Sequence, residues 1–285
     1  MENFGSNRDI NQNNTSNGFG SLVWYFLPTV VAVPPFGFLA NCLVICLLLG
    51  KPGICSTSEI FILNLALFDM LFCLLVLIEY ICFLCNQTLE ASNFLSWGLN
   101  QTGGPILLCI LGLDSYMAVC HPLVFLRLKD PRVRLSLCLV VSAITAAGCG
   151  LVKVSATYKW NVTMVILSGA SVTISTCNIL VLKSLRQSGP NKKEVHPVKK
   201  RAFNTVLTAL VLVNIHYLPP VIESLVKKFG PGFFTPFSFL SGITYTALSL
   251  SSFVQPMCYL VRTKQLPKMR FYCSSAAETK TVATV

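Results

Sequence analysis

Charged residues are scarce in this chain of 285 residues, since Asp, Glu, Lys and Arg together make up only 12% of it. Soluble domains carry about 25% charged residues. Hydrophobic residues here reach 53%, and the mean hydropathy is +0.66. This composition indicates a membrane protein. In a soluble domain the net charge of +11 would suggest nucleic-acid binding. Here the charges lie in short loops between apolar runs, so we expect no nucleic-acid partner.

The sequence also lacks the motifs that commonly mark enzymes and metal sites. It contains no HExxH, GxSxG or phosphate-loop motif. Thirteen cysteines occur, mostly inside apolar runs, but no group of Cys and His residues has the spacing of a zinc site. The first 20 residues lack the basic start and apolar core of a cleavable signal peptide. We therefore expect a non-enzyme whose first apolar segment directs its own membrane insertion.

Seven apolar segments are long enough to cross the hydrocarbon core, which takes about 20 helical residues. The connections between them are short. The chain is therefore predicted to be an all-α membrane protein, a seven-transmembrane helix bundle over residues 21–261, with an N-terminal arm (1–20) and a tail (262–285). The fourth segment is the weakest, because it just reaches the required length. The segments run over Ser21–Leu49, Ser58–Phe83, Ser92–Val119, Leu135–Val152, Val162–Leu182, Ala202–Val226 and Phe234–Val261.

The distribution of basic residues predicts the orientation in the membrane. Seventeen Lys and Arg residues fall in one set of connections and tail, and five fall in the opposite set. The basic side stays cytoplasmic, so the N-terminus is expected outside the cell and the C-terminus inside. Glycosylation acceptors of the N-x-[S/T] type agree with this orientation. The acceptors in predicted extracellular segments are Asn13, Asn14, Asn86 and Asn161.

Polar residues occur at membrane depth, where they are costly and usually face the bundle interior. Asp69 lies in the middle of the second segment. A carboxylate with amide and hydroxyl oxygens at one depth is a candidate site for a sodium ion. The alternative is an interior hydrogen-bond network around a protonated Asp69. The other members of this predicted network are Asn41, Asn100, Ser251, Ser252 and Gln255.

Five short motifs, in order and each on the expected helix, resemble those of the rhodopsin-like (class A) G-protein-coupled receptors. The resemblance covers all seven segments. Prolines 219 and 256 fall in the motifs of the sixth and seventh helices, where they tend to kink a helix. The motifs are Asn41 with Leu43-Val44, Asn64-Leu-Ala-Leu-Phe-Asp69, Leu113-Asp-Ser-Tyr-Met-Ala-Val-Cys-His-Pro122, Tyr217-Leu-Pro219 and Gln255-Pro-Met-Cys-Tyr259. A weaker likeness is to the nucleotide, protease-activated and lipid receptor subgroup.

The departures from the family pattern concentrate in the activation motifs. In the third-helix motif Asp114 and Tyr116 are present, but the family's arginine is replaced by Ser115. The sixth-helix tryptophan is Tyr217, and the seventh-helix asparagine is Gln255. A serine hydroxyl cannot make the charge-assisted contacts of a guanidinium. We therefore expect the receptor fold to be kept while coupling to a G protein is weakened or lost.

The resemblance also implies a ligand pocket that opens outward between helices three, five, six and seven. Trp97 stands where amine receptors carry an aspartate, so an amine ligand is disfavoured. Acids near the outer rim either pair with nearby lysines or meet a cationic ligand. The candidate lining residues are Glu79, Trp97, Tyr217, Glu223 and Tyr245.

Two readings of function follow from these residues. The first is a plasma-membrane receptor that transduces the signal of an unknown extracellular ligand to a heterotrimeric G protein or arrestin. The second is a receptor-fold protein that does not signal by itself, either a decoy or a partner subunit. In both, the basic third cytoplasmic loop is expected to meet either anionic membrane lipid or a protein partner. A short helix is expected near the start of the tail, and Cys273 is a candidate lipidation site.

Overall fold

The computed structural model describes residues 32–50, 59–85, 95–128, 130–154, 156–187, 197–229 and 239–262. Regular structure within these ranges is helical. Residues 95–98 form a short helical turn that continues into η1 and α4. The elements are a first helix over Ala32–Leu49, then α2 (Glu59–Leu84), the π-helix η1 (Leu99–Gly103), α4 (Gly104–Cys120), α5 (Pro122–Arg127), α6 (Pro131–Val154), α7 (Ala156–Gln187), α8 (Pro197–Phe229) and α9 (Phe239–Arg262).

Each predicted membrane segment contains one long helical stretch, which confirms the all-α seven-helix architecture. Residues 21–31 of the first segment lie outside the described residues, as does the predicted juxtamembrane helix after Arg262. The prediction that the fourth segment is barely long enough was wrong. Helix α6 has 24 residues and begins at Pro131, because Asp130 caps it: Asp130 Oδ1 accepts a hydrogen bond from the Arg132 amide at 2.9 Å.

The expected extracellular loop between the fourth and fifth segments, Lys153–Asn161, was also predicted wrongly. Helix α6 continues through Val154, and α7 begins at Ala156. The sequence contains no glycine or proline in this stretch to stop either helix. Asn161 consequently lies in the second turn of α7, where it is exposed.

The helices differ in how apolar they are. Within the part of the chain that the structure describes, five helical stretches are long and apolar enough to cross a membrane: Ala32–Leu49, Glu59–Cys82, Leu95–Cys120, Pro131–Leu151 and Asn161–Arg186. Helix α8 contributes a shorter apolar stretch, Leu210–Val226. Helix α9 is more polar, because serine and threonine recur along it and Gln255 lies near its end. Several of these polar side chains are buried, so α9 supplies polar groups to the interior of the bundle.

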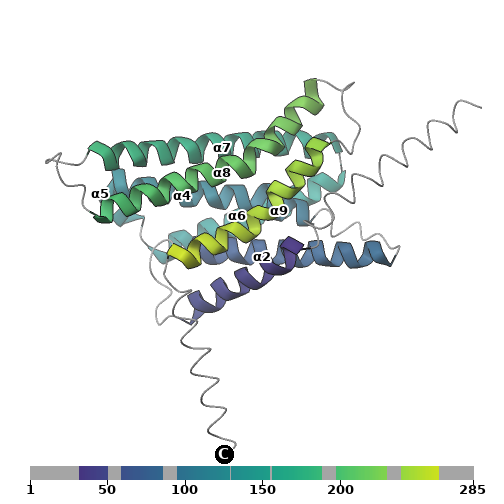
Figure 1. Ribbon diagram of the computed structural model, residues 1–285, viewed down its shortest axis with the longest axis horizontal. Helices are drawn as coiled ribbons and strands as arrows, with labels where there is room; N and C mark the ends of the chain where they lie inside the picture. Colours follow the sequence, from purple (N-terminus) through teal and green to yellow (C-terminus); the bar gives the residue numbers. More distant parts are fainter. Residues whose placement is uncertain are drawn as a thin grey trace, which may run out of the picture.

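Helix α4 lies inside the bundle and packs on α2, α6 and α7. Helix α8 lies between α7 and α9, and α9 returns to α2, which brings the two ends of the described chain together (Figure 1). Two apolar clusters mark these junctions. Val44 and Leu48 of the first helix pack with Ala66 and Leu260, and Tyr217 joins α7 to α9 through Leu167 and Leu248.

Large apolar side chains are exposed on the outer faces of the helices. Leu39, Leu139 and Val165 are examples, at 63%, 63% and 71% exposure. A soluble protein rarely exposes contiguous apolar surface on this scale. Lipid tails are as apolar as leucine, so such faces cost nothing in a bilayer, and the helices satisfy their backbone polar groups internally.

The stretch Leu95–Cys120, which comprises residues 95–98, η1 and α4 and is called helix three below, contains close contacts that only glycine permits. A Cβ atom added to Gly103 would lie 2.4 Å from the Phe68 ring and 2.8 Å from Thr145 Oγ1. Gly103 ends η1, whose wide π-helical turn is followed directly by Gly104 and Pro105. The missing side chain lets helix three approach both α2 and α6, which sets the position of Asp114 three turns further along.

Candidate functional site

An interior polar cluster joins the first helix, α2 and α9. Asn41 donates from Nδ2 to the Gly37 carbonyl at 2.9 Å and to the Ser252 carbonyl at 2.8 Å. Ser252 in turn donates from Oγ to Asp69 Oδ1 at 3.1 Å. All three polar residues are buried. The structure therefore brings together three residues that the sequence had placed in one network.

The same cluster presents oxygen atoms that lack hydrogen-bond partners among the described residues: Asn41 Oδ1 and Asp69 Oδ2. A buried polar atom without a partner costs free energy, so these oxygens call for a donor or a cation. Carboxylate, amide and hydroxyl oxygens are ligands that hard cations prefer. The donor set thus fits a small cation such as sodium.

Two predicted members of this network lie differently from Asn41, Asp69 and Ser252. Gln255 donates from Nε2 to Ser251 Oγ at 2.6 Å, a contact between two residues one turn apart on α9. Asn100 lies in η1 and is half-buried. No hydrogen bond within the described ranges joins Asn100 to the other members, and its inclusion in the network stays a prediction.

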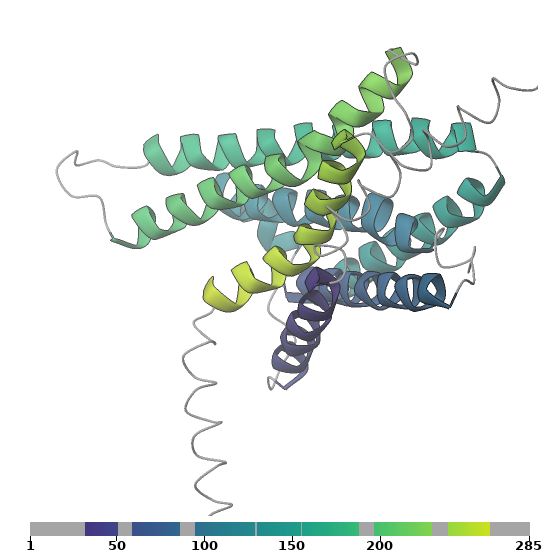
Figure 2. The same cartoon turned by 45° about the vertical axis from the view of Figure 1, so that its right-hand side comes forward.

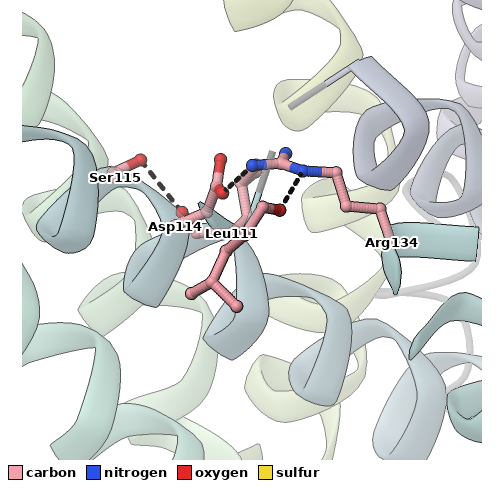
Figure 3. Close-up of polar contacts among 5 residues, drawn as sticks. Leu111, Asp114, Ser115 and Arg134 are labelled. Carbon is pink, nitrogen blue, oxygen red and sulfur yellow. Dashed lines mark hydrogen bonds and ion pairs between the residues drawn. The ribbon is translucent and has the colours of Figure 1, made fainter. Parts of the chain in front are cut away.

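A second polar cluster lies at the end of the bundle where α5 connects α4 to α6. Asp114 accepts a charge-assisted hydrogen bond on Oδ1 from Arg134 Nη2 at 2.6 Å (Figure 3). Their side chains are only 9% and 2% exposed. Arg134 Nε donates to the Leu128 carbonyl at 3.2 Å. Its guanidinium also lies over the rings of Phe61 and Phe125, 5.2 and 5.6 Å from their centroids.

Ser115 points away from this ion pair. It is exposed, and its Oγ donates back to the Leu111 carbonyl of its own helix at 2.9 Å (Figure 3). A serine that bonds to its own helix backbone satisfies its hydroxyl locally. The Ser115 hydroxyl is thus bonded within its own helix, and the loss of the contacts that the family's arginine makes stays a prediction.

Tyr116 contacts His121, the residue that directly follows helix α4. Its hydroxyl and His121 Nε2 are hydrogen-bonded at 3.1 Å, and the two rings meet edge to face with centroids 5.4 Å apart. His121 has φ −134° and ψ 62°, outside the helical region, and Pro122 then begins α5. The Tyr116–His121 contact braces the corner at which the chain turns.

Sequence reasoning missed Arg134, because it was counted with the basic residues of a loop. The signal that identifies it is helical periodicity. Arg134 begins a buried stripe of α6 that continues through Cys138, Val141 and Thr145, at intervals of three and four residues. Arg132, two positions earlier, falls outside this stripe and is exposed. A cation in register with a buried stripe needs a buried anion.

The predicted ligand-lining residues lie on several helices. Ser96 donates to Glu79 Oε1 at 2.8 Å, so α2 and the start of helix three meet at Glu79, next to the buried Trp97. Tyr217 is buried in the apolar junction of α7, α8 and α9. Glu223 is buried on α8. Tyr245 belongs to α9, but its side chain lies outside the described residues.

The prolines of the family motifs lie inside helices, as expected. Pro219 and Pro220 are in α8, and Pro256 is in α9. Helix α8 changes direction toward its C-terminal end (Figure 2), as missing backbone donors in a helix interior produce. Tyr259 packs against the Val44 and Leu260 cluster at the end of α9.

Several predicted modification sites fall in other parts of the chain. Asn13, Asn14, Asn86 and Cys273 lie outside the described residues. Cys85 and Cys149 both have free thiols. Cys149 is buried against Gly98, where an added Cβ would lie 2.0 Å from its Sγ.

Comparison with known proteins shows that this chain is similar to receptors. Residues 40–154 match the model of the family described as 7 transmembrane receptor (rhodopsin family). The chain is 28% identical to human galanin receptor type 1, over 88% of this chain and 82% of that protein. It is 27% identical to bovine somatostatin receptor type 5, over 67% of this chain and 60% of that protein.

The bundle is thus that of a multi-pass protein of the plasma membrane. These matches confirm the resemblance to the rhodopsin-like, class A, G-protein-coupled receptors that was seen in the motifs of the chain. Its relatives are receptors rather than enzymes, which agrees with the missing catalytic motifs. The finer likeness to the nucleotide, protease-activated and lipid receptor subgroup stays a prediction.

Proposed function

We propose that this receptor transduces an extracellular ligand signal through a switch that is weakened relative to its family. The observation that carries the proposal is Ser115. Its hydroxyl is bound to its own helix, while Asp114 is already neutralised by Arg134 from another helix. The family's third-helix arginine therefore has no counterpart at its own position. A heterotrimeric G protein or arrestin remains the expected partner, engaged at the α5 end of the bundle.

The orientation and the ligand belong to the same proposal. The α5 end carries Arg127 and Arg132, and residues 183–201, which run from the end of α7 to the start of α8, include seven Lys and Arg residues, so we place this end in the cytoplasm. The relatives are receptors named for galanin and somatostatin. These two ligands are the first to test. The half-buried Glu79 and the buried Glu223 favour a ligand with cationic groups over a carboxylate ligand.

The test compares the native chain with Ser115→Arg, which restores the family's arginine. Ser136→Arg is the matched control, because Ser136 is also exposed and also donates to its own helix, at the Val133 carbonyl. Basal and ligand-stimulated G-protein activation is measured by energy-transfer sensors. An epitope tag at the N-terminus, stained on intact cells, gives the surface level and tests the orientation.

We expect Ser115→Arg to activate a G protein about tenfold more than the native chain, which corresponds to one charge-assisted hydrogen bond of about 1.5 kcal/mol. Ser136→Arg should match the native chain. Native activation equal to that of Ser115→Arg would contradict a weakened switch. If neither signals with any ligand tested while both reach the surface, the decoy or partner-subunit function replaces the proposal.

We further propose that the Asn41, Asp69 and Ser252 cluster holds a sodium ion in the resting receptor. The unpartnered oxygens of Asn41 and Asp69 support this assignment, as does the hydroxyl of Ser252 beside the carboxylate. A bound cation would supply the charge that neutralises Asp69 at membrane depth.

A further inference from the structure

Arg134 is the most deeply buried charge at the α5 end of the bundle, with 1% of the residue exposed. Removing a guanidinium from water is costly unless its charge and donors are satisfied. Helix α6 is 24 residues long, and the exposed positions on either side of Arg134 in its first turn could hold an arginine in water instead. The buried position therefore needs a reason beyond solubility or membrane orientation.

The contacts of Arg134 come from three different elements besides its own. The anion is Asp114 of α4. The second acceptor is the carbonyl of Leu128, the residue that follows α5 directly. The guanidinium faces are covered by Phe61 of α2 and Phe125 of α5. One side chain thus connects α6 to α2, α4 and α5.

Helix α5 has little other support. It spans only six residues, none of which is buried, and Leu123 and Leu126 are 79% and 62% exposed. A helix of this length does not persist by itself. Phe125 and the Leu128 carbonyl are the points where the α5 segment meets the guanidinium of Arg134.

We propose that Arg134 is a positioning residue that takes over the ion pair of the missing third-helix arginine and uses it to hold α5 in place. Asp114 fixes the guanidinium on α4, and the guanidinium then fixes α5 through Leu128 and Phe125. In this arrangement the pairing with Asp114 no longer depends on residue 115, which explains how a serine is tolerated there. The proposal concerns the placement of α5 and does not depend on whether the receptor signals.

The proposal makes the fork shape of arginine necessary. Nη2 and Nε bind two acceptors at once while the planar group lies over two rings. Lysine carries the charge but not the fork, and methionine fills space without charge. If Arg134 acted only by filling volume, methionine would replace it better than lysine would.

The test is amide hydrogen exchange of the full chain in lipid nanodiscs, followed by mass spectrometry of the peptide that covers residues 121–128. The reporting amides are those of Phe125, bonded to the His121 carbonyl, and Leu128, bonded to the Val124 carbonyl. Arg134→Gln should speed their exchange about tenfold, because α5 opens locally. Arg132→Gln is the matched control, since it removes an exposed arginine from the same helical turn, and it should leave exchange unchanged.

Two further variants separate the fork from the volume. Arg134→Lys should recover part of the protection, and Arg134→Met should recover none. The proposal is overturned if Arg134→Gln or Arg134→Met gives a folded receptor with native exchange at 121–128, or if Met protects better than Lys. If the Arg134 variants fail to fold, the exchange of residues 121–128 is measured in Asp114→Asn instead. Faster exchange than in Arg132→Gln supports the proposal, and native exchange overturns it.

Discussion

At the scale of single residues, the role of each polar group depends on what faces it across a helix junction. Ser115 and Arg134 show this most clearly. Ser115, at the position of the family's third-helix arginine, is compatible with the fold because its hydroxyl donates to the Leu111 carbonyl. A basic residue that reads as part of a loop is instead buried against Asp114 and two aromatic rings.

Gly103 gives a prediction at the same scale. Gly103→Ala should destabilise the receptor by about 1–3 kcal/mol, because its Cβ would overlap the Phe68 ring and Thr145 Oγ1. Gly150→Ala is the control, since no atom lies within 4 Å of the added Cβ. That change should be neutral or stabilising by up to about 1 kcal/mol, because alanine favours a helix. Thermal unfolding in detergent measures both, and equal melting temperatures would show that α2 and helix three are not packed this closely.

At the scale of elements, helix α6 begins four residues earlier than predicted, and its N-terminal cap explains the difference. Asp130 and Pro131 form a cap and first-turn pair that starts α6 before its apolar stretch begins. The extra turn is the one that carries Arg134. An apolar-length criterion alone begins the helix at Leu135 and leaves Arg134 outside it.

The cap can be tested directly. Asp130→Ala removes the acceptor for the Arg132 amide and should lower stability by about 1 kcal/mol. Asp130→Asn keeps a side-chain acceptor and should lose only a small part of this. The measurement is the melting temperature of the purified receptor. An alanine variant as stable as the asparagine variant would mean that the first turn of α6 does not depend on its cap.

At the scale of the whole molecule, the Asn41, Asp69 and Ser252 cluster connects the first helix to α2 and α9, elements far apart in sequence. A cation bound there would stabilise the folded bundle by mass action, by about 2.7 kcal/mol at a concentration one hundred times its dissociation constant. Sodium should therefore raise the melting temperature of the receptor.

The matched comparison uses sodium chloride and N-methylglucamine chloride at equal ionic strength, so that general screening is the same in both. The native receptor should melt at a higher temperature in sodium, and Asp69→Asn should melt at the same temperature in the two salts. A difference that persists in Asp69→Asn would place the sodium effect elsewhere. No difference in the native receptor would favour the alternative network, in which Asp69 is protonated and needs no cation.

The amino-acid sequence by itself determined the class of fold and the depth of its polar groups. The seven membrane segments can be recognised by comparing the length of each apolar stretch with the thickness of the bilayer. A carboxylate at membrane depth, such as that of Asp69, must face the interior of the bundle. Helix extents were predicted less well, because capping and the absence of breakers extended α6 and α7 beyond their apolar runs.

Only the tertiary structure decided which polar groups meet. Asp114 and Arg134 are 20 residues apart and on different helices, and their pairing depends on the angle and rotation at which α4 and α6 pack. Those are set by close contacts such as Gly103 against Phe68, which no local pattern contains.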